Sequence, residues 1–267
     1  MTAQSVALDS TAVRSQRSGM FLGFGTVFRK ELTEWLRGPK ALIVAGVSIA
    51  GAIFMTLIPF IAEATGESRD AGLLTMDPTA NVLLGWTGQT MAFIAVVSTM
   101  TLLSTERDRG TLAWSLTNPV SPTALIAAKF CAAMLVVSIT AVVLPLIVSS
   151  ALATVVYDGP PNLGIIGTFG ALFLALPAFY IALTIGFGTA IKSTAGVAGA
   201  AFAVMFVPQI LGGLVPIVND LSPTSIGAWA MAVGKGEFAS PLTLIGWGVS
   251  MVAIVVGAKV VFDRQEL

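Results

Sequence analysis

Histidine is missing from this chain of 267 residues, and cysteine occurs once, as Cys131. Without histidine and with one thiol, the chain cannot build a His/Cys metal site, hold a haem through histidine or close an intrachain disulfide. Cys131 stands at the start of an apolar run and is most simply interpreted as a small packing residue. The common metal and redox chemistries are therefore excluded within this chain.

Motifs for nucleotide hydrolysis and nucleophilic catalysis are missing too. A phosphate-binding loop needs the pattern G-x-x-x-x-G-K-[ST], and the single Gly-Lys pair, Gly234-Lys235, lacks it. No G-x-S-x-G elbow occurs, and no histidine is present to activate a serine or the cysteine. We therefore expect that the chain is not an enzyme and carries no cofactor of its own.

Charged residues are scarce, at 10% of the chain against 55% hydrophobic residues, and the mean hydropathy is +0.90. Soluble proteins have about 25% charged residues. Six charge-free runs are long enough to cross about 30 Å of hydrocarbon. The sequence therefore predicts an all-α membrane protein with six transmembrane helices, at about residues 41–62, 80–104, 127–156, 163–191, 194–216 and 239–261.

Positive charges divide unevenly between the connections of this pattern. Twelve of the 14 Lys and Arg residues fall in the termini or in the second and fourth connections, and Arg69 and Lys235 fall in the others. Short connections rich in Lys and Arg stay in the cytoplasm. We therefore expect a multi-pass protein of the plasma membrane with both termini inside the cell. The segment between the second and third spans is called here the first cytoplasmic connection.

The chain is predicted to have three parts. Residues 1–19 are interpreted as a flexible cytoplasmic tail. Residues 20–38 are predicted to form an amphipathic helix at the inner membrane interface, with Trp35 at headgroup depth. Its apolar stripe is Phe21, Phe24, Phe28, Leu32 and Trp35. Residues 39–267 form the six-helix domain, in which residues 215–237 are predicted as a broken or re-entrant helical segment before the sixth span.

Ionisable residues are rare inside the spans. No Asp, Glu, Arg or His lies within the six runs. Lys129, Lys192 and Lys259 stand at inner ends, where each side chain is expected to reach the membrane surface. A proton-coupled carrier would need a titratable relay, and none is evident. Energy for transport would therefore come from outside this chain.

The first cytoplasmic connection begins with the charged residues 106–109, Glu-Arg-Asp-Arg. Acidic residues are favoured at the start of a helix by its dipole, so Glu106 and Asp108 predict the beginning of a short cytoplasmic helix. Its apolar stripe would be Leu112, Leu116 and Val120. Pro119 and Pro122 are expected to end it, and they would leave unsatisfied backbone in lipid, so this segment is not predicted to span.

Residues 106–129 read ERDRGTLAWSLTNPVSPTALIAAK. They resemble the acidic, Gly-Thr-Leu, Leu, Pro-Val-Ser, Lys signature of permease subunits of ABC-2 type ATP-binding-cassette exporters. Residues 28–40, FRKELTEWLRGPK, are similar to the interfacial helix before the first span of that family, and the closing VFDRQEL is in character. The resemblance extends from about residue 24 to the end. Pro122 departs from the family, which often has Arg or Lys after Pro-Val-Ser.

The resemblance implies a permease that pairs with a second copy or a related permease. It also implies two cytoplasmic ATPase subunits, which would carry ATP and Mg, and contact with membrane lipid but not with nucleic acid. The first cytoplasmic connection and the interfacial helix would form the docking surface. The ATPase-coupling residues would be Glu106, Arg107, Asp108, Arg109, Gly110, Thr111 and Leu112. The supporting residues of the interfacial helix would be Arg29, Lys30, Glu31 and Glu34.

A translocation path is expected between the two permeases. Its candidate lining residues belong to the second and fifth spans and suit a lipid-like or hydrophobic compound. They are Asn81, Gln89, Met91, Met205 and Gln209. Two other functions stay open: a secondary carrier that uses sodium and the carbonyls of broken helices, which need no buried charge, and a non-transporting membrane anchor or assembly subunit.

Overall fold

The structure is a computed structural model, and it describes residues 21–65, 77–84, 88–108, 120–157 and 159–263. The predicted tail, residues 1–19, lies outside these ranges. All regular secondary structure in the described part of the chain is helical, which confirms the all-α prediction. In chain order the elements are α2 (Phe24–Arg37), α3 (Pro39–Thr65), α4 (Pro78–Leu84), α5 (Gly88–Thr99), α6 (Thr101–Asp108), α8 (Pro122–Val137), η1 (Ser138–Val143), α9 (Leu144–Val156), α10 (Leu163–Phe173), α11 (Ala175–Ala190), α12 (Thr194–Leu214), α13 (Pro216–Leu221), η2 (Pro223–Ser225), α14 (Ile226–Lys235) and α15 (Pro241–Asp263).

Five helical stretches of the described residues are long and apolar enough to cross a membrane. They are Lys40–Ala62, Thr123–Val156, Leu163–Ala190, Thr194–Leu214 and Pro241–Val261. Each agrees with one of the predicted spans to within a few residues at either end. Where the second span was predicted, residues 80–104, the chain instead forms the shorter helices α4, α5 and α6 in succession.

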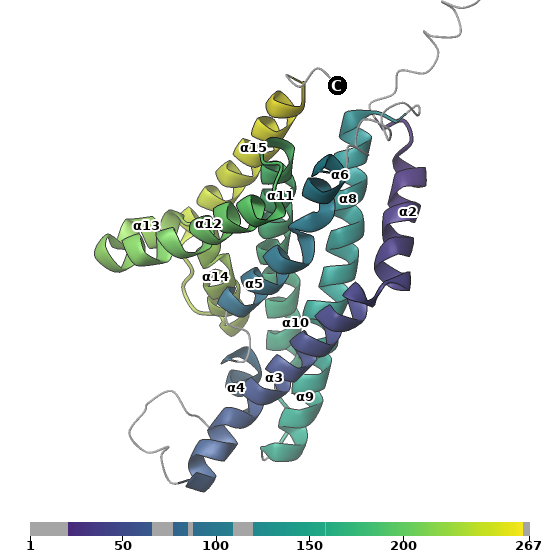
Figure 1. The fold of residues 1–267 in the computed structure, drawn as a ribbon. Coiled ribbons are helices and arrows are strands. Elements are labelled where there is room, and N and C mark those ends of the chain that lie inside the picture. The colour runs from purple at the N-terminus through teal and green to yellow at the C-terminus, as the bar shows by residue number, and fades with distance from the viewer. Residues whose placement is uncertain (1–20, 66–76, 85–87, 109–119, 158, 264–267) are drawn as a thin grey trace, which may run out of the picture.

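Helix α11 lies at the centre of the bundle (Figure 1), where it packs against α5, α6, α8, α12 and α15. Eleven of its 16 residues are buried. Its sequence is apolar on every side, as expected of a helix enclosed by other helices. In α15, by contrast, only 11% of the spanning window is buried. The outer helices thus present the continuous apolar surface that is typical of contact with a membrane.

Proline sets the points at which the long helices are interrupted. Helices α8 and α9 are joined by η1, a π-helical turn that ends two residues before Pro145. Proline lacks an N–H and its ring clashes with the carbonyl four residues back, so a wider turn relieves the clash. Helices α10 and α11 are separated at Leu174, three residues before Pro177.

Residues 215–237, predicted as a broken helical segment, form α13, the 3-10 turn η2 and α14. Helix α14 packs along α10, and α13 packs against α15. At that second contact, a Cβ on Gly246 would lie 1.9 Å from the carbonyl oxygen of Leu221. Only glycine permits two backbones to approach so closely. In Figure 1, α12 and α13 extend together to one side of the bundle.

Trp35 is buried in the main hydrophobic core because α2 packs against α8, and its position at headgroup depth stays a prediction. One side chain differs in burial from the prediction. Cys131 was expected to be a packing residue, but it is exposed on α8.

Candidate functional site

Helices α2 and α8 lie side by side and run in the same direction (Figure 1). The backbone N–H of Ser121 donates to the carbonyl of Leu22 at 3.0 Å, and farther along both helices Glu31 meets Lys129. The difference in residue number between the contacting residues is nearly the same at both places. Since both helices rise by about 1.5 Å per residue, this requires that they run parallel. A small apolar cluster fills the space between α2, α6 and α8, and its members are Val27, Leu103, Leu125 and Ala128.

The sequence fixes the starts of both helices. Helix α2 begins after Gly23, whose φ of +82° favours glycine. A Cβ at Gly23 would also lie 2.7 Å from Cγ2 of Val120. Helix α8 begins at Pro122, and the Ser121 hydroxyl accepts a hydrogen bond from the N–H of Ala124. Pro122 opens α8, where a fixed φ and a missing N–H are favourable. Most of the cytoplasmic helix that Pro122 was expected to end lies outside the described residues.

A buried ion cluster joins three helices at this place. The Lys129 ammonium of α8 donates to Oε1 of Glu31 of α2 at 2.7 Å. The same ammonium lies 3.0 Å from Oε1 of Glu106, in α6. The Lys129 and Glu31 side chains are 2% and 4% exposed, and that of Glu106 is 19% exposed. We call Lys129, Glu31 and Glu106 the buried ion cluster.

The position of Glu106 differs from the prediction. It was expected near the start of a new helix, but it lies in the last turn of α6. The carbonyl end of a helix carries a partial negative charge and disfavours a carboxylate. The adjacent ammonium of Lys129 offsets this repulsion, and the ammonium of Lys30 lies 3.7 Å away on the solvent side. Glu106 is therefore held by cations and not by a helix N-terminus.

Lys30 borders the cluster and is half exposed. Partial burial is the largest single influence on its pKa and lowers it, but Glu34, Glu106 and Glu31 together outweigh burial and raise the pKa above 10.5. Any stability that this raised pKa contributes is present below about pH 10.5 and is lost as pH rises through the higher folded-state pKa. Lys30 therefore stays positively charged at physiological pH.

The predicted supporting residues of α2 separate into two groups. Arg29, Lys30 and Glu34 are exposed, so they are accessible to a partner. Glu31 is buried beneath α8 and contacts Lys129, so it supports the docking surface from within. Among the predicted coupling residues, Glu106 lies in α6 and belongs to the buried ion cluster. Arg107 and Asp108 belong to α6, and Arg109, Gly110, Thr111 and Leu112 lie outside the described residues.

Lys129 was not predicted as part of the site. It was expected to extend to the membrane surface, but it is buried with two carboxylates, whereas Lys192 and Lys259 are exposed. One signal was present in the sequence. Glu31 lies four residues from both Val27 and Trp35, on the buried side of α2, so a buried carboxylate needed a cation.

Helix α6 is tied to the remaining bundle above this cluster. Leu103 packs against Gly188 of α11, where a Cβ would lie 2.9 Å from Cβ of Leu103. The Ser104 hydroxyl lies 3.0 Å from that of Thr194, at the start of α12. Lys40 of α3 donates to the Thr101 hydroxyl at 3.2 Å. A displacement of α6 would therefore be felt by α3, α11 and α12.

The candidate path residues fall into two groups. Gln209 of α12 donates a hydrogen bond to Gln89 of α5. Beside this pair, Phe93 and Phe202 stack with ring centroids 5.3 Å apart. Gln209 and Phe93 are exposed, so α5 and α12 present a mixed aromatic and amide surface. Asn81, Met91 and Met205 are instead fully buried within the subunit and are not exposed on this surface.

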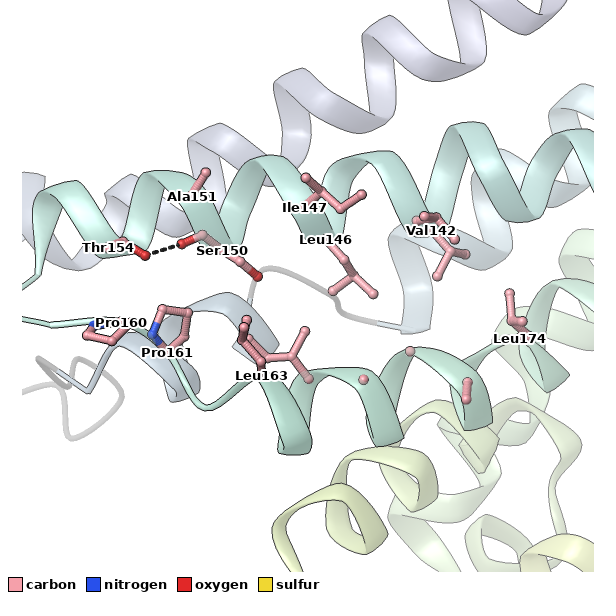
Figure 2. A pocket seen from close by; sticks show the side chains of 15 residues that line it. Val142, Leu146, Ile147, Ser150, Ala151, Thr154, Pro160, Pro161, Leu163 and Leu174 are labelled. Atoms are coloured by element: carbon pink, nitrogen blue, oxygen red, sulfur yellow. Dashed lines mark hydrogen bonds between the residues drawn. The ribbon is translucent and has the colours of Figure 1, made fainter.

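An apolar cavity of about 590 Å³ opens between α9 and α10 (Figure 2). Leu146 and Ile147 of α9 face Leu163 and the small residues of α10 across it. Its hydroxyl groups belong to Ser150 and Thr154, and Thr154 donates to the Ser150 carbonyl at 2.8 Å. No charged residue lines this cavity among the described residues, so it suits hydrocarbon chains better than polar solutes.

Comparison with known protein families identifies the family of this chain. The family model described as ABC-2 family transporter protein matches residues 26–267. The chain belongs to the ABC-2 transporter family. No curated protein matches the chain.

Membership accounts for the apolar helices, and it makes this chain an ABC-2 membrane transport protein. Permeases of the ABC-2 family normally work with ATPase subunits. The matched region begins inside α2 and therefore includes the buried ion cluster and both helices of the candidate path surface.

Proposed function

We propose that this protein is the membrane-spanning permease subunit of an ABC-2 exporter in the plasma membrane. A separate ATPase supplies the energy and carries ATP and Mg, with two ATPase subunits per complex. Helices α4, α5 and α6 together make the second of six crossings, which leaves both termini in the cytoplasm. Family membership over residues 26–267 is the observation that carries this proposal.

The buried ion cluster gives the ATPase a rigid part to act on. Glu106 lies in the last turn of α6, before the undescribed part of the first cytoplasmic connection, and Lys129 lies in α8, which follows it. Their contact, together with Glu31, fixes both ends of the connection to α2. Buried charge pairs are costly to separate, so the three helices move as a unit. A push on residues 107–112 would then displace α2, α6 and α8 together.

The translocation path lies between two permeases, which are two copies of this chain or this chain and a related one. The α5–α12 surface supports this assignment because it leaves Phe93 and Gln209 exposed in a single chain. Its aromatic rings and amides would suit a substrate with a large apolar part. A protein-lined path also agrees with the exposed Gln209 amide, because the hydrogen-bonding groups that its bond to Gln89 leaves over would be unfavourable in lipid.

Charge reversal in the first cytoplasmic connection tests the docking claim. The variant Arg107→Glu/Arg109→Glu should insert into membranes normally and lose its ATPase during purification, because two attractive contacts become repulsive. The yield of proteins with an ATP-binding-cassette ATPase sequence is measured by quantitative mass spectrometry of the purified complex. Lys235→Glu, predicted to lie on the outer side, is the matched control and should retain the ATPase. Equal ATPase recovery from all three proteins would contradict the proposal.

A further inference from the structure

A second apolar groove lies at the end of the bundle where α8 begins and α15 ends. Its volume is about 300 Å³, and its walls belong to α8, α11 and α15. Gly186 of α11 forms part of the lining, and a Cβ there would lie 3.0 Å from Cγ2 of Ile254. The close contact of α11 with α15 closes the groove on its inner side. We call this space the α8–α15 groove.

The groove is polar at one end and apolar at the other. Thr123, in the first turn of α8, and Lys259, near the end of α15, are both exposed. Phe130 and Met251 line the groove farther along the same two helices. At about 1.5 Å per residue these pairs are about 10–12 Å apart along the helix axes, most of the roughly 15 Å of hydrocarbon in one leaflet.

One exposed lysine and one helix N-terminus lie at the polar end. The N-terminus of α8 carries a partial positive charge from its helix dipole. Among the side chains that the structure describes, which do not include that of Asp263, Lys259 takes part in no ion pair, unlike Lys30 and Lys129. No acidic residue lines the groove in the described ranges. An anion that carries a long apolar chain would match both ends.

We propose that the α8–α15 groove binds one anionic phospholipid. The phosphate of its headgroup lies at Lys259 and Thr123, and one acyl chain lies between Ile126, Phe130 and Ile254. The volume is at the low end of the range of about 300–1,000 Å³ for small-molecule sites, which limits the groove to a single chain. The lipid would join α15, in which only 11% of the spanning window is buried, to α8 and the buried ion cluster that α8 carries.

Lipid titration of the full purified chain in detergent tests the proposal. Native mass spectrometry would count the phosphatidylglycerol and phosphatidylcholine bound when both carry the same acyl chains. The wild type should bind one phosphatidylglycerol more tightly than phosphatidylcholine. Lys259→Gln should lose about fivefold in phosphatidylglycerol affinity, the effect of one surface lysine. Lys192→Gln removes another exposed lysine that does not line the groove, and it should leave the affinity unchanged.

Variants that fill the groove with a larger side chain distinguish binding of the acyl chain from electrostatic attraction of the headgroup alone. Ala127→Phe, at a half-buried lining position, should lower the affinity for both lipids at least tenfold. Val255→Phe repeats this test from the exposed mouth of the groove if Ala127→Phe does not fold. Equal losses from Lys259→Gln and Lys192→Gln, unchanged binding in a folded filling variant, or displacement of the lipid by inorganic phosphate alone would each overturn the proposal.

Discussion

Removing the cation of the buried ion cluster should destabilise the protein severely. In Lys129→Met, Glu31 and Glu106 face each other's negative charge without the ammonium that lies 2.7 and 3.0 Å from them. Removing one partner of a buried ion pair costs about 3–5 kcal/mol. For a domain of this size that is a fall of roughly 6–20 °C in the unfolding temperature. The variant Lys192→Met removes an exposed lysine and should shift it little.

The double variant Glu31→Met/Lys129→Met sharpens this test. Replacing both partners of a buried pair by apolar side chains is often neutral, so the double variant should be more stable than Lys129→Met. Circular dichroism of the detergent-purified proteins during heating measures the unfolding temperatures, and size-exclusion chromatography checks that each is folded beforehand. Unfolding of Lys129→Met within about 2 °C of Lys192→Met would contradict the predicted cost of the unpaired carboxylates. So would a double variant whose loss equals the sum of the losses of Lys129→Met and of the single variant Glu31→Met.

Two further stability predictions compare matched pairs of residues. Gly246→Ala should destabilise the fold by more than the usual 1–3 kcal/mol of overpacking, because the added Cβ would meet the Leu221 carbonyl. Gly248→Ala is the control, because a Cβ there meets nothing within 4 Å. Equal unfolding temperatures for Gly246→Ala and Gly248→Ala would contradict the close contact between α13 and α15. Tyr157→Phe removes a 2.7 Å hydrogen bond to a carbonyl of α3 and should lower the free energy of unfolding by about 1 kcal/mol. The Tyr180 hydroxyl has no hydrogen-bond partner among the described residues, so Tyr180→Phe should be neutral or stabilising. A larger loss for Tyr180→Phe than for Tyr157→Phe in the same thermal assay would refute this account.

Hydropathy predicted most of the helices because a membrane leaves few alternatives. An apolar run of about 20 residues must be helical to satisfy its backbone in lipid, so the bounds of helices such as α12 follow from composition. The division of the second span into α4, α5 and α6 did not follow, because the prediction rested on the absence of charged residues, and residues 80–104 hold none. Whether such a run stays straight depends on the helices around it.

The candidate site was predicted in part. Charges in residues 106–109 and in α2 indicated where to look, and Glu106 and Glu31 do lie together. Their common partner could not be identified, because Lys129 is distant in sequence and an apolar run ending in lysine is ordinarily interpreted as a membrane anchor. Burial of Asn81 and Met205 likewise depends on which side of each helix meets α9 or α11, and single-helix periodicity did not indicate that side.

The central claim is that an ATPase binds the first cytoplasmic connection. A photo-crosslinking amino acid at position 108, in the last turn of α6, tests this contact in intact cells, with the same label at position 235 as the control. The account predicts a covalent product between position 108 and an ATP-binding-cassette ATPase, identified by mass spectrometry, and none from position 235. A product from position 235, or none from position 108 while the ATPase co-purifies, would contradict it.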